Sequence, residues 1–311
     1  METKKGIVLI AAGHPVYTHY AVNLAMSIRD HSDIPIVLYA HGVGVNYLFQ
    51  DQKDLFTEIR ELPPHTYITY SGAHYVKAKL FLYELSPFEE TLFLDTDMIF
   101  CDSRISGKKV EHIFLENQDK EIQFASRGDK TMDEGIRSEW VNLKEVQAIH
   151  GFNHWYEVSS EVIYFKKGDV SKSVFDKALY YYDNPGMETK RWTVVDGRPK
   201  LEEKPNAIAE FAGGIPDEVP FSMALESTGV KINGTYSPSY WQPHFFNRVK
   251  SDSDIQKNYY LVSIGGALLQ PNTKRLYNTL ARYYSEKTEH KRPPYQAVEK
   301  KSVLKTERRF V

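Results

Sequence analysis

The chain has 311 residues, of which 41% are hydrophobic and 26% are charged, and its formal net charge at pH 7 is -2. This balance is typical of a globular protein with a sizeable core, and it argues against a chain that binds polyanions over its whole surface. The single cysteine, Cys101, excludes an intramolecular disulfide and a cysteine-based metal site, and it fits a reducing compartment.

The first forty residues predict a β-α-β start. A buried strand is expected over 6–12, a tight loop at Gly13, a helix over 16–30 and a second strand over 34–39. The N-terminal apolar run is too short for a signal peptide, and no stretch has the length of a membrane span. We therefore expect a cytoplasmic protein.

A pair of acids stands out in the next part of the chain. The pattern predicts a helix over 73–85, which carries Lys79, followed by a strand over 91–100 with the sequence TLFLDTDMIF. Side chains at i and i+2 of an extended segment point the same way, so Asp95 and Asp97 are expected to converge on one hard cation at the carboxyl edge of a sheet. The alternative is a strand-to-turn junction in which two solvated aspartates cap the chain.

The remaining elements complete a mixed α/β pattern. We expect strands, helices and a hairpin in the order strand 121–125, strand 157–165, helix 170–182, hairpin within 184–205, helix 217–228, strand 259–264 and helix 273–285. The predicted fold is a mixed, mainly parallel central sheet flanked by helices. We expect one domain over 1–286, with an elaborated C-terminal half, and a basic tail over 287–311 that is solvated.

Several residues near the acid pair suit a nucleotide ligand. Lys79 can reach a phosphate, and Tyr17 can stack on a base. The loop residues leave room for the backbone to approach the nucleotide, and Thr96 lies between the two aspartates; the full set is Ala11, Ala12, Gly13, Tyr17, Lys79 and Thr96. The ordinary alternatives are an exposed helix lysine, a loop glycine and a half-buried helix aromatic.

At this point the order of elements resembles the GT-A fold (Rossmann-related) glycosyltransferases. It is most similar to the retaining enzymes of family eight, which include the glycogenins and bacterial galactosyl- and glucosyltransferases. The likeness rests on Lys79 followed by FLDTDMIF and on the strand, loop and helix over 7–20. The resemblance implies that Asp95 and Asp97 hold Mn²⁺ or Mg²⁺.

The resemblance also implies roles for residues in the C-terminal half. The segment HFFNRVK is similar to the family's H-F-x-G-x-x-K, which implies His244 as the third metal ligand and Lys250 as a diphosphate contact, although Asn247 stands where glycine is expected. A competing alignment with the strand ending at Gly266 leaves no histidine, and His244 is then a loop residue.

Two further acids receive roles from the resemblance. DEVPFSMAL is similar to the family's Asp-Gln pair beside the transferred sugar, which implies Asp217, with Glu218 in place of glutamine; a helix N-cap is the alternative for Asp217. Glu161 corresponds by position to the family's N-A-G segment, none of whose residues match here. Asp217 or Glu161 would orient the sugar or steady the cationic transition state.

The expected function is therefore a metal-dependent glycosyltransferase. The donor would be a nucleoside-diphosphate sugar, with a UDP-sugar expected, and the resemblance implies retention of anomeric configuration. The acceptor is a glycan, a lipid-linked sugar, a protein or a modified nucleic acid, and a homo-oligomer is compatible with the sequence. The alternatives are a sugar nucleotidyltransferase, whose arginine-containing phosphate loop is not matched by AAGHP, and a nucleic-acid-binding module without activity.

Overall fold

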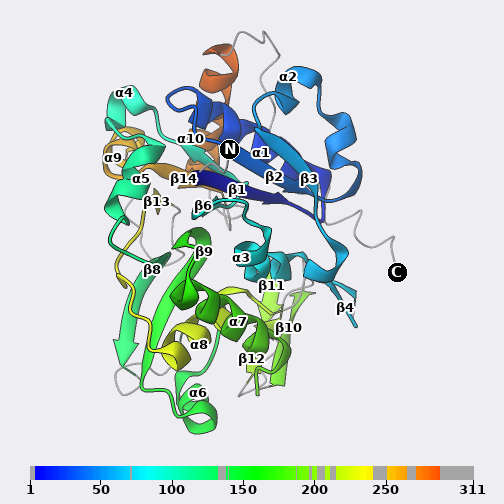
Figure 1. Cartoon of the computed structure of the whole chain (residues 1–311), viewed down its shortest axis with the longest axis vertical. Helices are drawn as coiled ribbons and strands as arrows, with labels where there is room; N and C mark the ends of the chain where they lie inside the picture. The colour runs from blue at the N-terminus through cyan, green and yellow to red at the C-terminus, as the bar shows by residue number, and fades with distance from the viewer. Residues whose placement is uncertain are drawn as a thin grey trace. The chain divides into compact units, whose positions relative to one another are not determined.

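The computed structural model describes residues 4–70, 72–131, 138, 140–186, 188–195, 198–201, 207–210, 215–240, 251–264 and 271–287. The described strands (Figure 1) are β1 Lys5–Ala11, β2 Ile36–Ala40, β3 Glu58–Glu61, β4 Ile68–Thr69, β5 Gly72–Ala73, β6 Glu90–Leu94, β7 Met98–Phe100, β8 Ile122–Thr131, β9 His154–Lys166, β10 Glu188–Val195, β11 Arg198–Leu201, β12 Ala207–Glu210, β13 Ser239–Tyr240 and β14 Leu261–Ser263. The described helices are α1 Pro15–Arg29, α2 Gln50–Lys53, α3 Leu82–Leu85, α4 Ser103–Ser106, α5 Val110–Glu116, α6 Leu143–His150, α7 Asp169–Asp183, α8 Glu218–Thr228, α9 Asp252–Asn258 and α10 Pro271–Lys287, with 3₁₀ segments η1 Gly42–Tyr47, η2 Pro64–Thr66 and η3 Tyr75–Phe81.

The largest sheet has six strands in the order β3-β2-β1-β6-β9-β8. Strands β1, β2 and β3 pair in parallel, whereas β8 and β9 pair antiparallel. Smaller sheets contain β11-β10-β12 and β13-β14-β7. The predicted fold class, a mixed α/β protein with a mainly parallel central sheet and flanking helices, is confirmed.

The chain divides into two compact units that are interleaved in sequence. The first unit comprises Met1–Lys4, Pro63–Phe93 and Asp119–Tyr236, and the second comprises Lys5–Leu62, Leu94–Gln118 and Ser237–Val311. Each unit is described by itself below. None of the described helices has the length and apolar character needed to cross a lipid bilayer.

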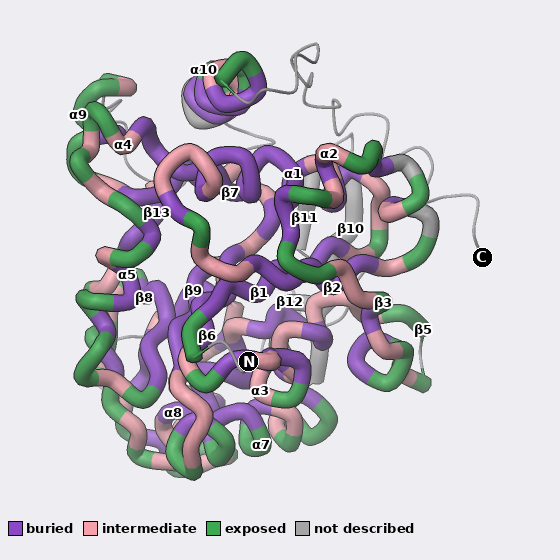
Figure 2. Tube along the Cα trace, turned by 45° about the horizontal axis from the view of Figure 1, so that its top comes forward, coloured by how far each residue is buried: buried purple, intermediate pink, exposed green. Residues whose placement is uncertain are grey.

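The second unit is built on the predicted β-α-β start. Strands β1 and β2 are buried along almost their whole length (Figure 2), as expected for parallel strands covered on both faces. Helix α1 begins with Pro15 in its first turn, and the His14 side chain accepts a hydrogen bond from the Val16 amide at 3.1 Å. The buried face of α1 then contacts β1, β7 and α10.

The first unit has its core between α8, α7 and β9. The rings of Phe124, Phe175 and Phe221 pack with centroids 4.8 and 5.6 Å apart. Helix α8 ends at Gly229, which takes the left-handed conformation that favours glycine. The hairpin predicted within 184–205 is confirmed by the antiparallel pairing of β10 with β11, although its turn residues lie outside the described part of the chain.

Two predicted elements were wrong in detail. The helix expected over 73–85 is instead the 3₁₀ segment η3 followed by the single turn α3. The strand expected over 91–100 is broken into β6 and β7 by a turn at Thr96 and Asp97. Short polar side chains such as Asp and Thr hydrogen-bond nearby backbone groups and so favour turns over continuous strands.

Candidate functional site

The acid pair lies in the turn between β6 and β7. Asp95 and Asp97 are both half-buried, while Thr96 between them is only 2% exposed. The argument from strand alternation therefore does not apply here, because Thr96 and Asp97 lie in a turn between the two strands. The turn itself is fixed in the second unit, where the Ile264 amide donates to the Asp97 carbonyl at 3.0 Å and β7 pairs with β14.

Asp95 and Asp97 supply only part of the coordination shell that a divalent cation needs. Within the described ranges, no group of three or more histidine, cysteine, aspartate or glutamate side chains is arranged to hold a metal ion. Two predicted partners, His244 and Lys250, lie outside the described residues. Mg²⁺ is commonly held by one or two carboxylates together with substrate phosphates, so the described residues fit a cation that shares its coordination with a phosphate ligand.

The first unit holds a buried cluster around Lys79. The Lys79 ammonium lies 3.4 Å from Asp217 Oδ2, and the two side chains are 14% and 5% exposed. Lys79 Nζ also donates to Ser160 Oγ at 3.2 Å and lies 5.7 Å from the centre of the Phe93 ring. Phe93 precedes Asp95 by two residues in the chain. The exposed-lysine alternative for Lys79 is therefore wrong.

The first turn of α8 supplies the acid of this cluster. Asp217 occupies the N-cap position but makes no capping hydrogen bond through its side chain. The N-cap alternative is therefore right about the position of Asp217, but its carboxylate lies 3.4 Å from Lys79 Nζ and does not cap the helix. A carboxylate at the start of a helix is also favoured by the helix dipole.

The β8–β9 pair has two irregularities, and one of them contributes to the Lys79 cluster. The pairing passes from Phe124–Ile163 directly to Ala125–Ser159, which leaves residues 160–162 of β9 in a bulge. This bulge contains Ser160, which accepts from Lys79, and Glu161, which is half-buried beside it. A second shift leaves residues 127–128 of β8 unpaired. Bulges bend a strand and re-aim its side chains, which suits a functional site.

Glu218, next to Asp217, has an unusual protonation equilibrium. Burial, and then the charge of Asp217, raises the pKa of Glu218 to about 7, while Lys79 and Arg127 oppose the shift. A carboxyl group with this pKa carries a proton over much of the neutral range. In that form it can donate a hydrogen bond as well as accept one.

We expect Glu218→Gln to stabilise the protein above pH 7 and to have no effect near pH 4.5. The folded state keeps a proton that the unfolded chain releases between pH 4.5 and about 7, so the wild type loses stability as pH rises through that window. The difference should reach about 1–3 kcal/mol. Melting temperatures at pH 4.5–8.5 test this, with exposed Glu121→Gln as the control; a pH-independent difference would contradict it.

The loop after β1 has the geometry expected of a close backbone approach. Ala11 is buried, Ala12 is half-buried and Gly13 is exposed with φ of 84°, a conformation that favours glycine. Tyr17 is half-buried in the first turn of α1, with its ring edge-on to Tyr20 at 6.2 Å. Tyr17 is thus the half-buried helix aromatic that the alternative to base stacking predicted.

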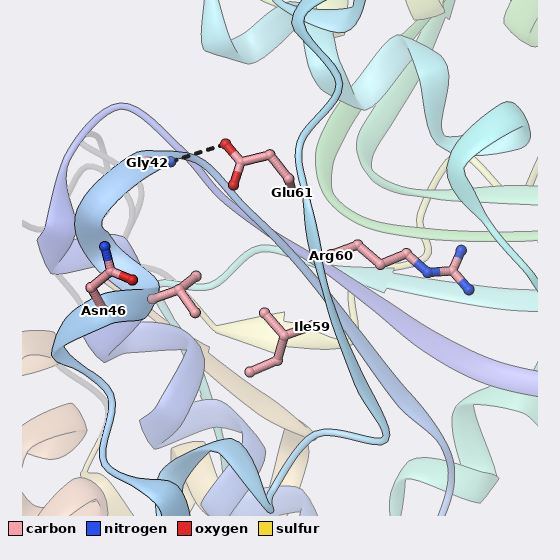
Figure 3. Close-up of a pocket in the computed structure, with 6 residues that line it drawn as sticks. Gly42, Asn46, Ile59, Arg60 and Glu61 are labelled. Carbon is pink, nitrogen blue, oxygen red and sulfur yellow. Dashed lines mark hydrogen bonds between the residues drawn. The ribbon is translucent and has the colours of Figure 1, made fainter.

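An open pocket of about 540 Å³ lies in the second unit between η1 and β3 (Figure 3), lined by Gly42, Val45, Asn46, Ile59, Arg60 and Glu61. It stands at the carboxyl ends of parallel β2 and β3, where open α/β sheets bind ligands. Its volume is typical of small-molecule sites. None of the residues predicted from the sequence lines it, because no motif marks η1.

The pocket walls are held in place by specific contacts. A Cβ on Gly44 would lie 2.3 Å from Thr18 Oγ1, so a larger residue there would force the Thr18 side chain to move. The Gly42 amide donates to Glu61 Oε1 at 3.4 Å. Arg60 extends away from Asn46 (Figure 3) and is bound to both carboxylate oxygens of Glu58, at 2.7 and 2.6 Å. Asn46, Glu61 and the aliphatic side chains of Val45 and Ile59 make up the rest of the pocket lining.

No protein-family model matches the chain, and no curated protein matches it. Among solved structures, the bifunctional glycosyltransferase WbbM is similar over 76% of this chain and 39% of its own, with 12% identity and a TM-score of 0.44. The glycosyltransferase GlyE of Streptococcus pneumoniae TIGR4 is similar over 59% of this chain and 40% of its own, with 14% identity and a TM-score of 0.37.

A galactosyltransferase, LgtC, solved with donor and acceptor sugar analogues, is similar over 57% of this chain and 65% of its own, with 14% identity and a TM-score of 0.34. The chain thus spans less than two thirds of each of these proteins. At such identities and TM-scores, activity has to be inferred from the residues of this chain.

Proposed function

We propose that this protein is a metal-dependent glycosyltransferase that moves a sugar from a nucleoside-diphosphate sugar to an acceptor hydroxyl. The observation that carries the proposal is the buried lysine of the first unit, which contacts Asp217, Ser160 and the ring of Phe93, two residues before the acid pair. A largely covered ammonium that has an acid and a hydroxyl among its partners is suited to bind an incoming phosphate.

Each described residue then has a stated role. Asp95 and Asp97 would hold Mn²⁺ or Mg²⁺, which when bound supplies Lewis-acid stabilisation of charge on the departing diphosphate. Lys79 would bind a phosphate oxygen, and Asp217 would accept hydrogen bonds from sugar hydroxyls. Glu161, in the β9 bulge, remains a second candidate for orienting the sugar. We assign no protein base.

We propose that the nucleoside of the donor binds in the second unit. The pocket of about 540 Å³ offers a carboxylate and an amide above an aliphatic floor, which suits the hydroxyls and flat ring of a nucleoside. Ala11, Ala12, Gly13 and Tyr17 would contact the same nucleotide, with Thr96 near its phosphates. We propose a UDP-sugar as the donor and retention of configuration as the outcome.

We expect the right donor to raise the melting temperature only when a divalent cation is present. Ligand at about 100 times its Kd adds roughly 2.7 kcal/mol to the free energy of unfolding, which corresponds to a shift on the order of 5 °C. The test is a thermal-shift screen of UDP-, GDP- and ADP-sugars with Mn²⁺ or with EDTA.

The variant Glu61→Ala should reduce this shift, whereas Lys172→Ala, on the exposed face of α7, should not. A folded protein that no nucleotide sugar stabilises in the presence of Mn²⁺ would overturn the proposed function.

A further inference from the structure

The turn at the end of α1 binds two other helices of the second unit. Asp30 Oδ1 accepts from the Lys287 ammonium of α10 at 2.9 Å. The Ser32 hydroxyl donates to Glu111 Oε1 in the first turn of α5. His31 lies between these two residues in the chain, and histidine is the side chain whose ordinary titration falls between pH 5 and 8. What His31 contacts therefore decides whether this turn responds to pH.

His31 holds the first amide of α5. The Val110 N–H donates to His31 Nε2 at 3.2 Å, and Val110, the first residue of α5, is fully buried. An imidazole nitrogen accepts a hydrogen bond only when it carries no proton, so the neutral ring must have its proton on Nδ1. A doubly protonated ring has no acceptor, and the buried Val110 amide would then lose this partner.

The surroundings of His31 favour the neutral ring. Its ring packs edge-on against the Phe100 ring of β7, with centroids 5.1 Å apart. Burial lowers the pKa of His31, and the charge of Lys109 acts in the same direction, whereas Glu111 and Asp30 act against it. Both of these acids already have partners, as described above. The positive end of the α5 dipole also disfavours a cation at this position.

We propose that His31 is a pH-sensitive link between α1 and α5, which releases the first turn of α5 when the imidazole is protonated. The inference concerns the second unit alone and does not depend on the proposed function. In the released state the ring is solvated and takes up a proton near pH 6.5, the usual value for histidine. The closed contact binds that proton less well, so it is complete above about pH 6.5 and is lost progressively as the pH falls below that value.

The test measures hydrogen exchange of single backbone amides by NMR, on the full-length protein between pH 7.5 and pH 5.5. Each rate is divided by the intrinsic rate at the same pH to give a protection factor. The Val110 amide should lose protection by roughly three- to tenfold over this range. The Leu24 amide, in the middle of α1, should keep its protection. Equal losses at Val110 and Leu24 would mean general unfolding in acid and would overturn the link.

The decisive variant is His31→Gln. Glutamine can place Oε1 near the position of Nε2, as an acceptor that does not titrate, so protection of Val110 should no longer vary with pH. The matched control is His112→Asn, because His112 Nδ1 accepts from the neighbouring Lys109 amide at 3.1 Å. Val110 should still lose protection in this control. The same loss in His31→Gln as in wild type would overturn the link.

The ring tautomer of His31 gives a second readout that needs no variant. At pH 7.5 the hydrogen bond from Val110 requires the proton on Nδ1 and none on Nε2. Nitrogen-15 correlation spectra of the imidazole rings distinguish the two tautomers. A ring that carries its proton on Nε2 at this pH would overturn the proposal, even if His31→Gln did not fold.

Discussion

Asp97→Asn and Asp95→Asn are each expected to lower Mn²⁺-dependent donor turnover by on the order of 10²–10³-fold, the loss seen when one preorganised charge-stabilising group is removed. Asparagine keeps the size of aspartate and an oxygen acceptor, so the turn between β6 and β7 should persist. What is lost is a negative charge, and a hard divalent cation binds carboxylates far better than amides.

Donor hydrolysis at several Mn²⁺ concentrations measures this effect. Because the variants would lose metal affinity, part of the activity should return at high Mn²⁺, which a simple folding defect would not allow. The control is Asp119→Asn, an exposed acid whose side chain is 67% accessible. Full activity in the Asp95→Asn/Asp97→Asn double variant would exclude a metal role for this turn.

Lys79→Met is expected to abolish donor turnover and also to destabilise the fold by roughly 3–5 kcal/mol. The stability loss follows from the geometry, since Asp217, whose side chain is 5% exposed, would lose the ammonium that lies 3.4 Å from its Oδ2. The activity loss follows from the proposed phosphate contact. Unfolding in urea and donor hydrolysis measure the two losses separately.

The double variant Lys79→Met/Asp217→Asn distinguishes the two causes. Removing both charges should restore most of the stability, because no unpaired charge then remains in the cluster. It should restore none of the activity, because the proposed phosphate contact is still missing. The double-mutant cycle measures the coupling between the two side chains. The matched control is Lys77→Met on the same 3₁₀ segment. Lys77 pairs at 2.9 Å with Asp183, whose side chain is 58% exposed and can be solvated, so this variant should remain active. Turnover retained in Lys79→Met would refute the phosphate role.

Local sequence patterns correctly predicted those elements whose conformation depends mainly on neighbouring residues in the chain. The strand β1 follows from an apolar run, and α1 follows from apolar residues at helical spacing. The same reasoning missed the break between β6 and β7, since an apolar run on both sides of DTD favours one strand. It also missed the 3₁₀ conformation of η3, because 3₁₀ and α segments share similar sequence patterns.

The candidate site depended more on tertiary structure. The acids of the DTD segment were visible in the sequence, and so was Lys79 as a candidate. The pairing of Lys79 with Asp217 was not, because it joins η3 to a helix far away in the chain. The bulge that includes Ser160 has no local signal, since only the register with β8 creates it. The pocket beside Glu61 likewise requires η1 to pack on α1.

The interleaving of the two units has a consequence for synthesis on the ribosome. The first unit needs residues up to Tyr236 and the second needs residues beyond Ser237, so neither is complete when the opening half of the chain has emerged. Early β-α-β structure therefore has to wait for late partners, with apolar strands uncovered in the meantime. A stop codon near the middle of the gene should therefore yield an insoluble fragment rather than an autonomous module.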